Sequence, residues 1–391
     1  MERIIVSLQN KDRPDLGWVE LVLPATEESL NSKLNVISVP YASSECNCIF
    51  TKPYKEATPF DFINDELVNV DELNYLAMRL DGFDKYEMAQ FQAAAHCENI
   101  NDVERLINLT FNTRNYTVAT NFSDVSSIGK RFYLDEHLSI TEGEFEKLNF
   151  AEKGYELLKS GNGTVTPFGV VYKHDREFMV PYRGTTFPQY DYNGDTVILI
   201  GLISSHDAPD TDNIAWLHLP VPDTSIEKAL NRLGIDETDM HMAHIYPDDM
   251  PEGIMQRIKI ENETIYTIND MCRAIAAVKL DDCPKLDAAC EFADVYAACD
   301  ITAIVKNIAL FKIYPGAGNA AEYGYRIAEN AGTFQYDQSL SKYFDFKALG
   351  EDRMAKEYGR FTGSGYTVFS KTPEVLDGLL TQEQSGTMAM G

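Results

Sequence analysis

The sequence predicts an α+β fold made of two similar units in one chain. Its 391 residues exceed what one hydrophobic core usually organises. Short β-rich runs stand at both ends of each half, with helical periodicity between them, and the same motifs recur in both halves. Strands and helices do not alternate as in a nucleotide-binding parallel sheet. We therefore expect each unit to have a small N-terminal β-sheet with a helix, a helical middle and a C-terminal helix with a hairpin, in an elongated, acidic protein.

Five pairs of segments carry the internal repeat. Similar residues recur within each pair, as in the Leu-x-Leu-Pro sequences that end at Pro24 and Pro220. The pairs are 21–30 with 217–226, 70–80 with 268–278, 129–132 with 324–327, 148–154 with 344–350, and 163–166 with 359–362. Each copy is far longer than the unit of a solenoid, so the repeat indicates a duplicated domain.

Local patterns predict the elements of each copy. Opening strands are expected at 3–9 and 196–203, and a short helix after each Leu-x-Leu-Pro sequence is capped by Thr26 or by Asp223. Apolar residues at helical spacing predict a central helix in each copy: Leu73, Leu76, Ala77 and Leu80 in the first, and Met271, Ile275 and Val278 in the second. Further helices are expected at 102–109 and 301–310, and closing hairpins at 164–172 and 360–370.

The repeat sets the expected domain bounds. The first unit covers 1–178 and the second 196–371. Residues 179–195 are rich in proline, glycine and polar residues, which is typical of a linker. The repeat stops after the second unit, and 372–391 is expected to be a flexible tail.

The charge of the chain restricts its partners. The formal net charge is -27, from 34 basic and 61 acidic side chains. Nucleic acids and anionic membranes would be repelled, whereas a basic partner would be attracted. The same charge also favours solubility, and composition alone leaves that alternative open.

Cysteine usage and hydropathy predict a cytoplasmic protein. Seven cysteines are present, several among small apolar residues, and we expect all of them to be reduced thiols. The first residues have no apolar run long enough for a signal peptide, and no later run is long enough for a transmembrane helix.

Motifs for catalysis or cofactor binding are weak, so the chain is not expected to be an enzyme. His241 and His244 could share one face of a helical turn, but no third metal ligand stands at a recognisable spacing. The adjacent residues 205–207, Ser-His-Asp, cannot form a catalytic triad, because triads assemble from distant positions. The paired glycines lie in no phosphate-binding motif. We expect no cofactor and no metal, and an acidic hydrolase remains a weak alternative.

Acidic residues are concentrated in the helical middle of each copy. Residues 61–156 hold 19 acids and 8 bases, and residues 236–300 hold 15 acids and 5 bases. An amphipathic helix buries its apolar stripe and displays the remaining side chains, so these carboxylates are predicted to form partner-binding tracks. The first copy contributes Asp61, Asp65, Glu66, Asp71, Glu72, Asp81, Asp84, Glu87, Glu98, Asp102, Glu104, Asp135, Glu136, Glu142, Glu144 and Glu146. The second contributes Asp236, Glu237, Asp239, Asp248, Asp249, Glu252, Asp281, Asp282, Asp287 and Glu291.

The order of these motifs resembles the ArdA antirestriction family of conjugative elements and phages. The similar features are the Leu-x-Leu-Pro strands, the Glu-Leu-Asn-Tyr-Leu helix start at 72–76, the segments 129–133 and 148–154, and a Gly-Thr-Val turn into the final hairpin. The similarity covers residues 2–175 and 195–371. In the second copy, 271–274 replaces the Leu-Asn-Tyr-Leu sequence, and Lys279, Lys285, Lys306 and Lys312 stand near the helices. These departures leave open the alternative that the second copy mainly supports the fold and does not mimic DNA as well as the first.

The resemblance implies a DNA mimic that occupies the DNA-binding groove of the specificity and methyltransferase subunits of type I restriction-modification enzymes. Another nucleic-acid enzyme, such as a CRISPR effector, is the alternative target. Typical members pair as homodimers of one-unit chains, and the pairing segments correspond here to 125–140 and 321–334. The resemblance thus predicts a unit–unit interface within one chain, as a pseudo-dimer, or a homodimer. The interface residues would be Gly129, Phe132, Tyr133, Gly324, Tyr325 and Ile327.

Overall fold

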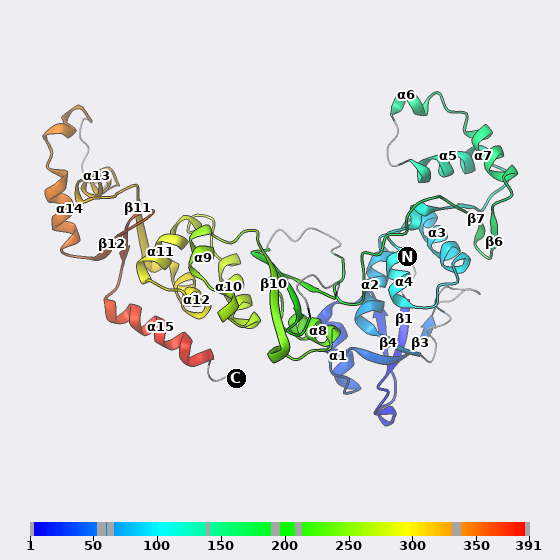
Figure 1. Cartoon of the computed structure of the whole chain (residues 1–391), viewed down its shortest axis with the longest axis horizontal. Coiled ribbons are helices and arrows are strands. Elements are labelled where there is room, and N and C mark those ends of the chain that lie inside the picture. The colour runs from blue at the N-terminus through cyan, green and yellow to red at the C-terminus, as the bar shows by residue number, and fades with distance from the viewer. Residues whose placement is uncertain are drawn as a thin grey trace. The chain divides into compact units, whose positions relative to one another are not determined.

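Two units divide the chain, and each contains sheets and helices, as the α+β prediction requires. The computed structural model describes residues 4–52, 60, 66–137, 141–188, 196–207, 213–330 and 338–387. Unit 1 comprises Met1–Tyr192 together with Glu227–Ile235, and unit 2 comprises Asn193–Ile226 and Asp236–Gly391. Figure 1 labels most of the helices and strands.

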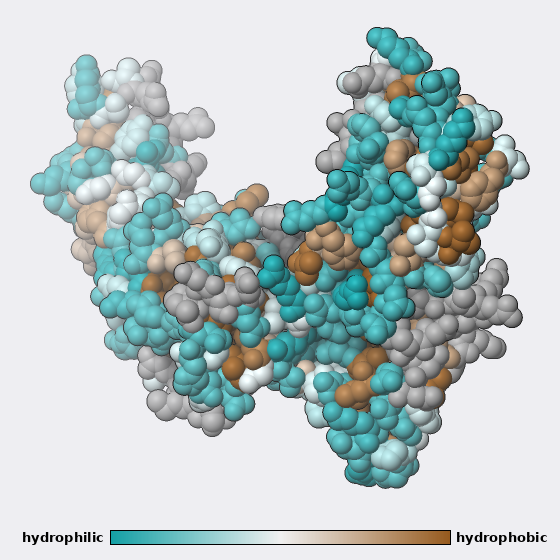
Figure 2. Space-filling model, turned by 45° about the vertical axis from the view of Figure 1, so that its right-hand side comes forward, coloured by the Kyte–Doolittle hydropathy of each residue, from teal (hydrophilic) through white to brown (hydrophobic). Residues whose placement is uncertain are grey.

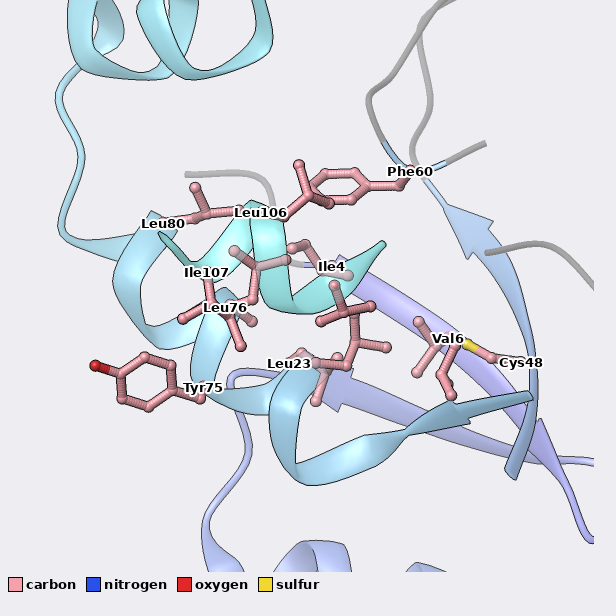
Figure 3. Close-up of a cluster of buried hydrophobic side chains, with 14 of the residues drawn as sticks. Ile4, Val6, Leu23, Cys48, Phe60, Tyr75, Leu76, Leu80, Leu106 and Ile107 are labelled. Atoms are coloured by element: carbon pink, nitrogen blue, oxygen red, sulfur yellow. The ribbon is translucent and has the colours of Figure 1, made fainter. Parts of the chain in front are cut away.

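Unit 1 begins with a four-stranded antiparallel sheet in the order β2-β1-β3-β4. Its strands are β1 (Ile4–Gln9), β2 (Val19–Leu23), β3 (Glu45–Lys52) and β4 (Glu66–Asn69). Alternate residues of β1 are buried, because successive side chains of a strand point to opposite faces. Helices α1 (Glu27–Val36), α2 (Val70–Asp81), α3 (Lys85–Cys97) and α4 (Val103–Leu109) complete this part of the unit. Figure 3 shows Leu76, Leu80, Leu106 and Ile107 from α2 and α4 meeting Ile4, Val6 and Leu23 of the sheet.

The rest of unit 1 is a three-stranded sheet and a helix pair. The sheet has the order β5-β7-β6, from β5 (Tyr116–Ala119), β6 (Thr164–Thr166) and β7 (Gly169–Lys173). Helix α5 (Val125–Glu136) packs against α7 (Phe150–Lys159), with the short α6 (Glu142–Phe145) between them in sequence. Helix α3 contacts all three strands of this sheet (Figure 1).

Unit 2 has corresponding elements. Its first sheet, in the order β10-β8-β9, consists of β8 (Ile198–Ser204), β9 (Ala215–Leu219) and β10 (Met240–Pro247). Its second, in the order β11-β13-β12, consists of β11 (Phe311–Pro315), β12 (Tyr358–Thr362) and β13 (Gly365–Phe369). The helices are α9 (Glu252–Arg257), α10 (Ile265–Ala276), α11 (Leu286–Ala293), α12 (Ala298–Lys306), α13 (Ala320–Asn330), α14 (Phe346–Met354) and α15 (Pro373–Thr387). Helix α8 (Asp223–Leu233) begins in unit 2 and ends in unit 1.

One asparagine in each unit ties the central helix to the Leu-x-Leu-Pro strand. The Asn74 amide accepts from the backbone N–H of Ala25 (2.7 Å) and donates to its carbonyl (3.0 Å). Asn269 makes the same two bonds with Val221, at 2.9 and 2.8 Å. The prolines that precede Ala25 and Val221 both follow cis peptide bonds.

This contact corrects our alignment of the central helices by three residues. Helix α2 begins at Val70 and α10 at Ile265, so Asn74 and Asn269 hold the same position in their helices. Of the Glu-Leu-Asn-Tyr-Leu sequence, the asparagine is the residue that recurs unchanged in α10. The alignment of 70–80 with 268–278 was wrong because a shift of three residues is close to one helical turn and leaves the apolar residues nearly in phase.

Two further segments differ from the expected boundaries. Residues 179–188 belong to unit 1. The Asn108 side chain hydrogen-bonds both the N–H and the carbonyl of Tyr182, and the Asn112 side chain does the same with Met179. Tyr182 is fully buried, so aromatic packing holds a segment whose composition suggested a linker. In the expected tail, Pro373–Thr387 forms α15, which packs on α12 and buries Leu376.

The two helix caps predicted after the Leu-x-Leu-Pro strands also have defined places. The Thr26 hydroxyl accepts from the N–H of Ser29, which confirms it as the cap of α1. Asp223 is the first residue of α8, and its carboxylate accepts hydrogen bonds from Asn269 and Arg273.

Candidate protein-binding surface

Most of the predicted carboxylates in the described part of the chain are at the surface. The exposed ones are Glu66, Asp81, Asp84, Glu104, Glu136, Glu142, Glu146, Asp236, Glu237, Asp239, Asp248, Asp249, Glu252 and Asp281. Asp61 and Asp65 lie outside the described residues, as does the side chain of Glu144. Figure 2 shows hydrophilic residues over much of the face in view, with hydrophobic residues in small separate patches. A partner that meets this surface would contact mainly polar and charged groups.

In unit 2, acidic residues stand at both ends of β10, an edge strand. Asp236, Glu237 and Asp239 lie at the short helical turn before it. Asp248, Asp249 and Glu252 follow its last residue, and Glu252 is the first residue of α9. Because of an irregularity, the eight residues of β10 pair with seven residues of β8, a length of about 20 Å, which is the rise of about six base pairs at 3.4 Å each. The two groups of carboxylates are therefore separated by a length comparable to a DNA contact site.

Aromatic side chains lie near the end of β10 and were not predicted as part of the site. Tyr246 is 53% exposed and its ring centroid lies 6.0 Å from that of Trp216 on β9. His244 lies 5.8 Å from Trp216 by the same measure, at a positive φ of 48° within an irregularity of the strand. An exposed tyrosine beside carboxylates offers apolar contact area to a partner. Tyr246 stands between Ile245 and Pro247, so the local sequence gives no signal that its side chain is exposed.

In unit 1, several predicted acids cap helices. Asp84 Oδ1 accepts from the backbone N–H groups of Tyr86 and Glu87, while Glu87 Oε2 accepts from the N–H of Asp84, which forms a capping box on α3. These backbone hydrogen bonds hold the pKa of Asp84 below its usual range. Asp102 caps α4 by accepting from the N–H of Arg105. The caps fix these carboxylates in place near the surface.

Four other predicted acids have structural partners. Asp71, with a side chain 11% exposed, accepts from Lys228 Nζ at 2.9 Å and lies 3.6 Å from Arg232. Glu72 accepts from the buried Tyr182 hydroxyl at 2.8 Å, and burial raises the pKa of Glu72. The other two bind backbone N–H groups: Asp287 that of Ile254 and Glu291 that of Gly363. Their carboxylates are committed within the fold rather than offered to a partner.

Glu98 and Asp282 are half-buried and ion-paired. Glu98 accepts from Lys173 Nζ at 2.8 Å and from the Tyr116 hydroxyl, and Asp282 accepts from Lys285 Nζ at 2.6 Å. Such pairs reduce the charge that these residues present to a partner.

Asp135 was expected to be exposed, and that expectation is wrong. The residue is 8% exposed, and its Oδ2 accepts from Tyr86 (3.1 Å), Gln90 (3.1 Å) and Thr117 (2.7 Å). Burial raises the pKa of Asp135, while these three hydrogen bonds oppose the shift. The donors come from α3 and β5, which the local sequence around Asp135 does not reveal.

The residues expected at a unit–unit interface pack inside their own units. A Cβ added to Gly129 of α5 would lie 2.0 Å from the Phe150 carbonyl oxygen of α7, and one added to Gly324 of α13 would lie 1.8 Å from that of Phe346 in α14. Phe132 stacks on His174, Tyr133 on His137, and Tyr325 packs edge-on against Phe346, while Ile327 is 8% exposed in the core. The recurrence of these residues is explained by close helix packing in each unit.

The described residues also bear on metal binding and on membrane-spanning helices. No group of three histidine, cysteine or acidic side chains is close enough there to hold a metal ion, and His241 and His244 lie on β10 rather than on a helix. No described helix is both long and apolar enough to cross a membrane.

Comparison with known protein families gives a match to the part of the chain that contains β10 and the carboxylates at its two ends. Residues 214–368 match the family model described as Antirestriction protein (ArdA). The ArdA match extends from the start of β9 almost to the end of β13, and it contains every carboxylate predicted for the second copy. A search of curated proteins finds no match to the chain. The ArdA match covers one unit and associates it with antirestriction function.

Proposed function

We propose that this chain is a DNA-mimic antirestriction protein that binds the DNA-binding groove of a type I restriction-modification enzyme. The observation that carries the proposal is the ArdA match over 214–368 together with the carboxylates at both ends of β10. A groove that binds DNA is lined with lysine and arginine side chains that contact phosphates. Carboxylates on a rigid scaffold satisfy the same side chains, so the groove is occupied and DNA is excluded.

We further propose that residues 1–178 form a second unit of the same domain. Three matched features support this: the Asn74 and Asn269 contacts, the glycine contacts between α5 and α7 and between α13 and α14, and the order of the C-terminal sheets. Gly169 and Gly365 also share positive φ angles of 134° and 139° at the same place in the final hairpin. Two units in one polypeptide would supply what the family's homodimers supply from two chains.

The proposed mechanism is electrostatic and has no chemical step. Complementary charge speeds association and makes it sensitive to salt, because ions screen the attraction. Single carboxylates at a wet interface contribute little each, so binding depends on their sum. A mimic therefore weakens gradually as acids are neutralised, whereas an acidic hydrolase would lose its activity with one catalytic residue.

A restriction assay in cells tests the function. Unmodified phage is plated on cells with a type I enzyme, with and without the intact chain, and the chain is expected to restore plating. Neutralising Asp236, Glu237 and Asp239, then also Asp249 and Glu252, should reduce protection in steps. The matched control neutralises five exposed acids elsewhere: Asp12, Glu20, Glu28, Asp352 and Glu374. No protection by the parent, or full loss from one substitution, would count against the proposal.

A further inference from the structure

Unit 1 contains a hollow of about 550 Å³ that the proposed mechanism has not used. It lies between the start of α3, the turn Thr113–Asn115, the end of α5 and α6. Four carboxylates line it, from Asp84, Glu87, Asp135 and Glu142, and two guanidinium groups, from Arg114 and Arg131. Tyr86, Leu134 and Phe145 supply an aromatic and apolar part of its lining. His137 also lines the hollow. Carboxylates outnumber guanidinium groups in the lining, which therefore has a negative balance beside aromatic rings that accept cations: Arg131 lies over Tyr86 and Lys130 over Phe145.

Asp135 is a buried carboxylate that has no cationic partner within ion-pair distance among the described residues. The Thr117 hydroxyl donates its one hydrogen bond to Asp135 Oδ2. In the 2.9 Å contact between Thr117 Oγ1 and His174 Nε2, His174 is therefore the donor. Burial, with the nearby charge of Arg176, lowers the pKa of His174 to about 4, so this histidine is neutral near pH 7. Arg131 acts on Asp135 electrostatically, but it does so from beyond ion-pair distance. A cation that enters the hollow and contacts the buried carboxylate directly would stabilise it further.

The hydrogen bonds of Asp135 leave one oxygen for a ligand. All three hydrogen-bond donors to Asp135 among the described residues bind its Oδ2. No donor or cationic side chain in the described part of the chain binds its Oδ1. The capping box holds Asp84 and Glu87 in the same way, through Asp84 Oδ1 and Glu87 Oε2. Three carboxylates are thus fixed by the fold, each with one oxygen outside these bonds. Preorganised acceptors bind a cation without first losing side-chain entropy.

Arg131 shows that the lining accepts a guanidinium group. Its guanidinium carbon lies 4.1 Å from the centre of the Tyr86 ring, and the Tyr86 hydroxyl donates to Asp135. Guanidinium is planar, binds carboxylates through several N–H groups and stacks on aromatic rings, whereas ammonium is a compact, strongly hydrated charge. The mixture of carboxylates with Tyr86 and Phe145 fits guanidinium better than ammonium.

The corresponding place in unit 2 has different chemistry. Asn99 and Asp294 share positive φ angles of 50° and 56°, and equivalent backbone bonds close the two helices before them, which aligns α3 with α11. By this alignment Asp84 corresponds to Lys279. A second hollow, of about 580 Å³, shares Lys279 with that place but takes much of its lining from α10 and α12, including Arg273 and Lys306, and none from α13 or α14. The place aligned with Asp84 thus carries a lysine in unit 2, and no carboxylate stands there to bind a cation.

We propose that the unit 1 hollow binds one arginine side chain of the partner protein, with Asp135 as the central acceptor. This rests on the proposed function, since it identifies an anchor within that same binding surface. Buried arginines are common among the few residues that dominate an interface. The two units would then differ: unit 1 would have an anchor site for a basic side chain, and unit 2 would not.

Ligand-observed NMR on the intact chain tests this without any partner enzyme. The probes are N-acetyl-arginine amide and N-acetyl-lysine amide. Saturable arginine binding is expected with a Kd of about 1 to 10 mM, the range for a few kcal/mol of interaction. Lysine binding should be several-fold weaker. Asp135→Asn should weaken arginine binding at least tenfold, whereas Asp12→Asn, which removes an exposed acid outside the predicted tracks and outside the lining of the hollow, should leave it unchanged.

The outcomes separate this inference from the proposed function. No saturable arginine binding, equal binding of lysine, or an unchanged Kd in Asp135→Asn would overturn the anchor site. Glu87→Gln gives a second test should Asp135→Asn fail to fold, and it should weaken arginine binding about threefold to tenfold, as expected for one hydrogen bond to a charged group. Arginine binding together with no effect on restriction would instead contradict the proposed function.

Discussion

Substitution of Gly350 by alanine tests the helix packing that explains the recurring glycines. A Cβ on Gly350 would lie 1.9 Å from the Ala320 carbonyl oxygen and 2.8 Å from its carbon. These are backbone atoms, so no side-chain rotation can relieve the contact, and α13 and α14 must move apart. Gly378 in α15 provides the matched control, because an added Cβ there meets nothing within 4 Å.

The two substitutions should change stability in opposite directions. Overpacking costs about 3 kcal/mol at its usual upper limit, and alanine returns about 1 kcal/mol of helix propensity. Gly350→Ala should therefore destabilise unit 2 by about 2 kcal/mol, whereas Gly378→Ala should stabilise it by up to about 1 kcal/mol. Hydrogen exchange read by mass spectrometry should show faster exchange in α13 and α14 of Gly350→Ala only. Unchanged exchange and unchanged stability in that variant would refute the packing argument.

Three other predictions concern charge and thiols. Lys228→Ala leaves Asp71, whose side chain is 11% exposed, with Arg232 as its remaining ion-pair partner, and should destabilise unit 1 by about 3 kcal/mol in denaturant titrations. The double variant Lys228→Met with Asp71→Asn should recover most of the lost stability. No recovery would contradict the ion-pair explanation. The pKa of His174 is lowered from 6.5 to about 4, so the unfolded chain binds the proton at higher pH than the folded chain does. Stability should therefore fall by up to about 3 kcal/mol as pH falls from 6.5 to 4. His174→Gln should flatten this pH dependence in thermal melts, and an unchanged slope would argue against the shifted pKa. The exposed Cys283 should be alkylated first at pH 8, because burial raises the pKa of four other thiols, those of Cys46, Cys48, Cys272 and Cys290, to about 12. Peptide mass spectrometry reads the order of labelling, and early labelling of these four cysteines would contradict their burial.

The sequence predicted those parts of the fold that depend on neighbouring residues. Alternating apolar residues gave the strands, and the Leu-x-Leu-Pro motif located the end of β2 and of β9. The matching positions of Asn74 in α2 and Asn269 in α10 could not be found from local sequence, since each asparagine is recognised by the distant backbone that it binds. Residues 179–188 were interpreted as a linker because their packing on α2 and α4 depends on side chains far away in the chain.

The candidate site was predicted in outline rather than residue by residue. Net charge and acid-rich stretches identified the regions, because exposed carboxylates need no specific partner. They could not separate Asp84, which caps a helix at the surface, from Asp135, which is buried by Tyr86, Gln90 and Thr117. Nor could they show that Asp287 and Glu291 hold backbone groups, since those contacts join distant segments.

Competition for DNA binding tests the central claim most directly. The purified chain is titrated against a labelled DNA duplex bound to a type I methyltransferase core, at low and at raised salt. The account predicts that the chain displaces the DNA, and that the affinity of the chain for the enzyme, measured separately, falls as salt rises. Absence of displacement at either salt concentration, with an enzyme core that binds its DNA normally, would contradict binding in the DNA groove of that enzyme.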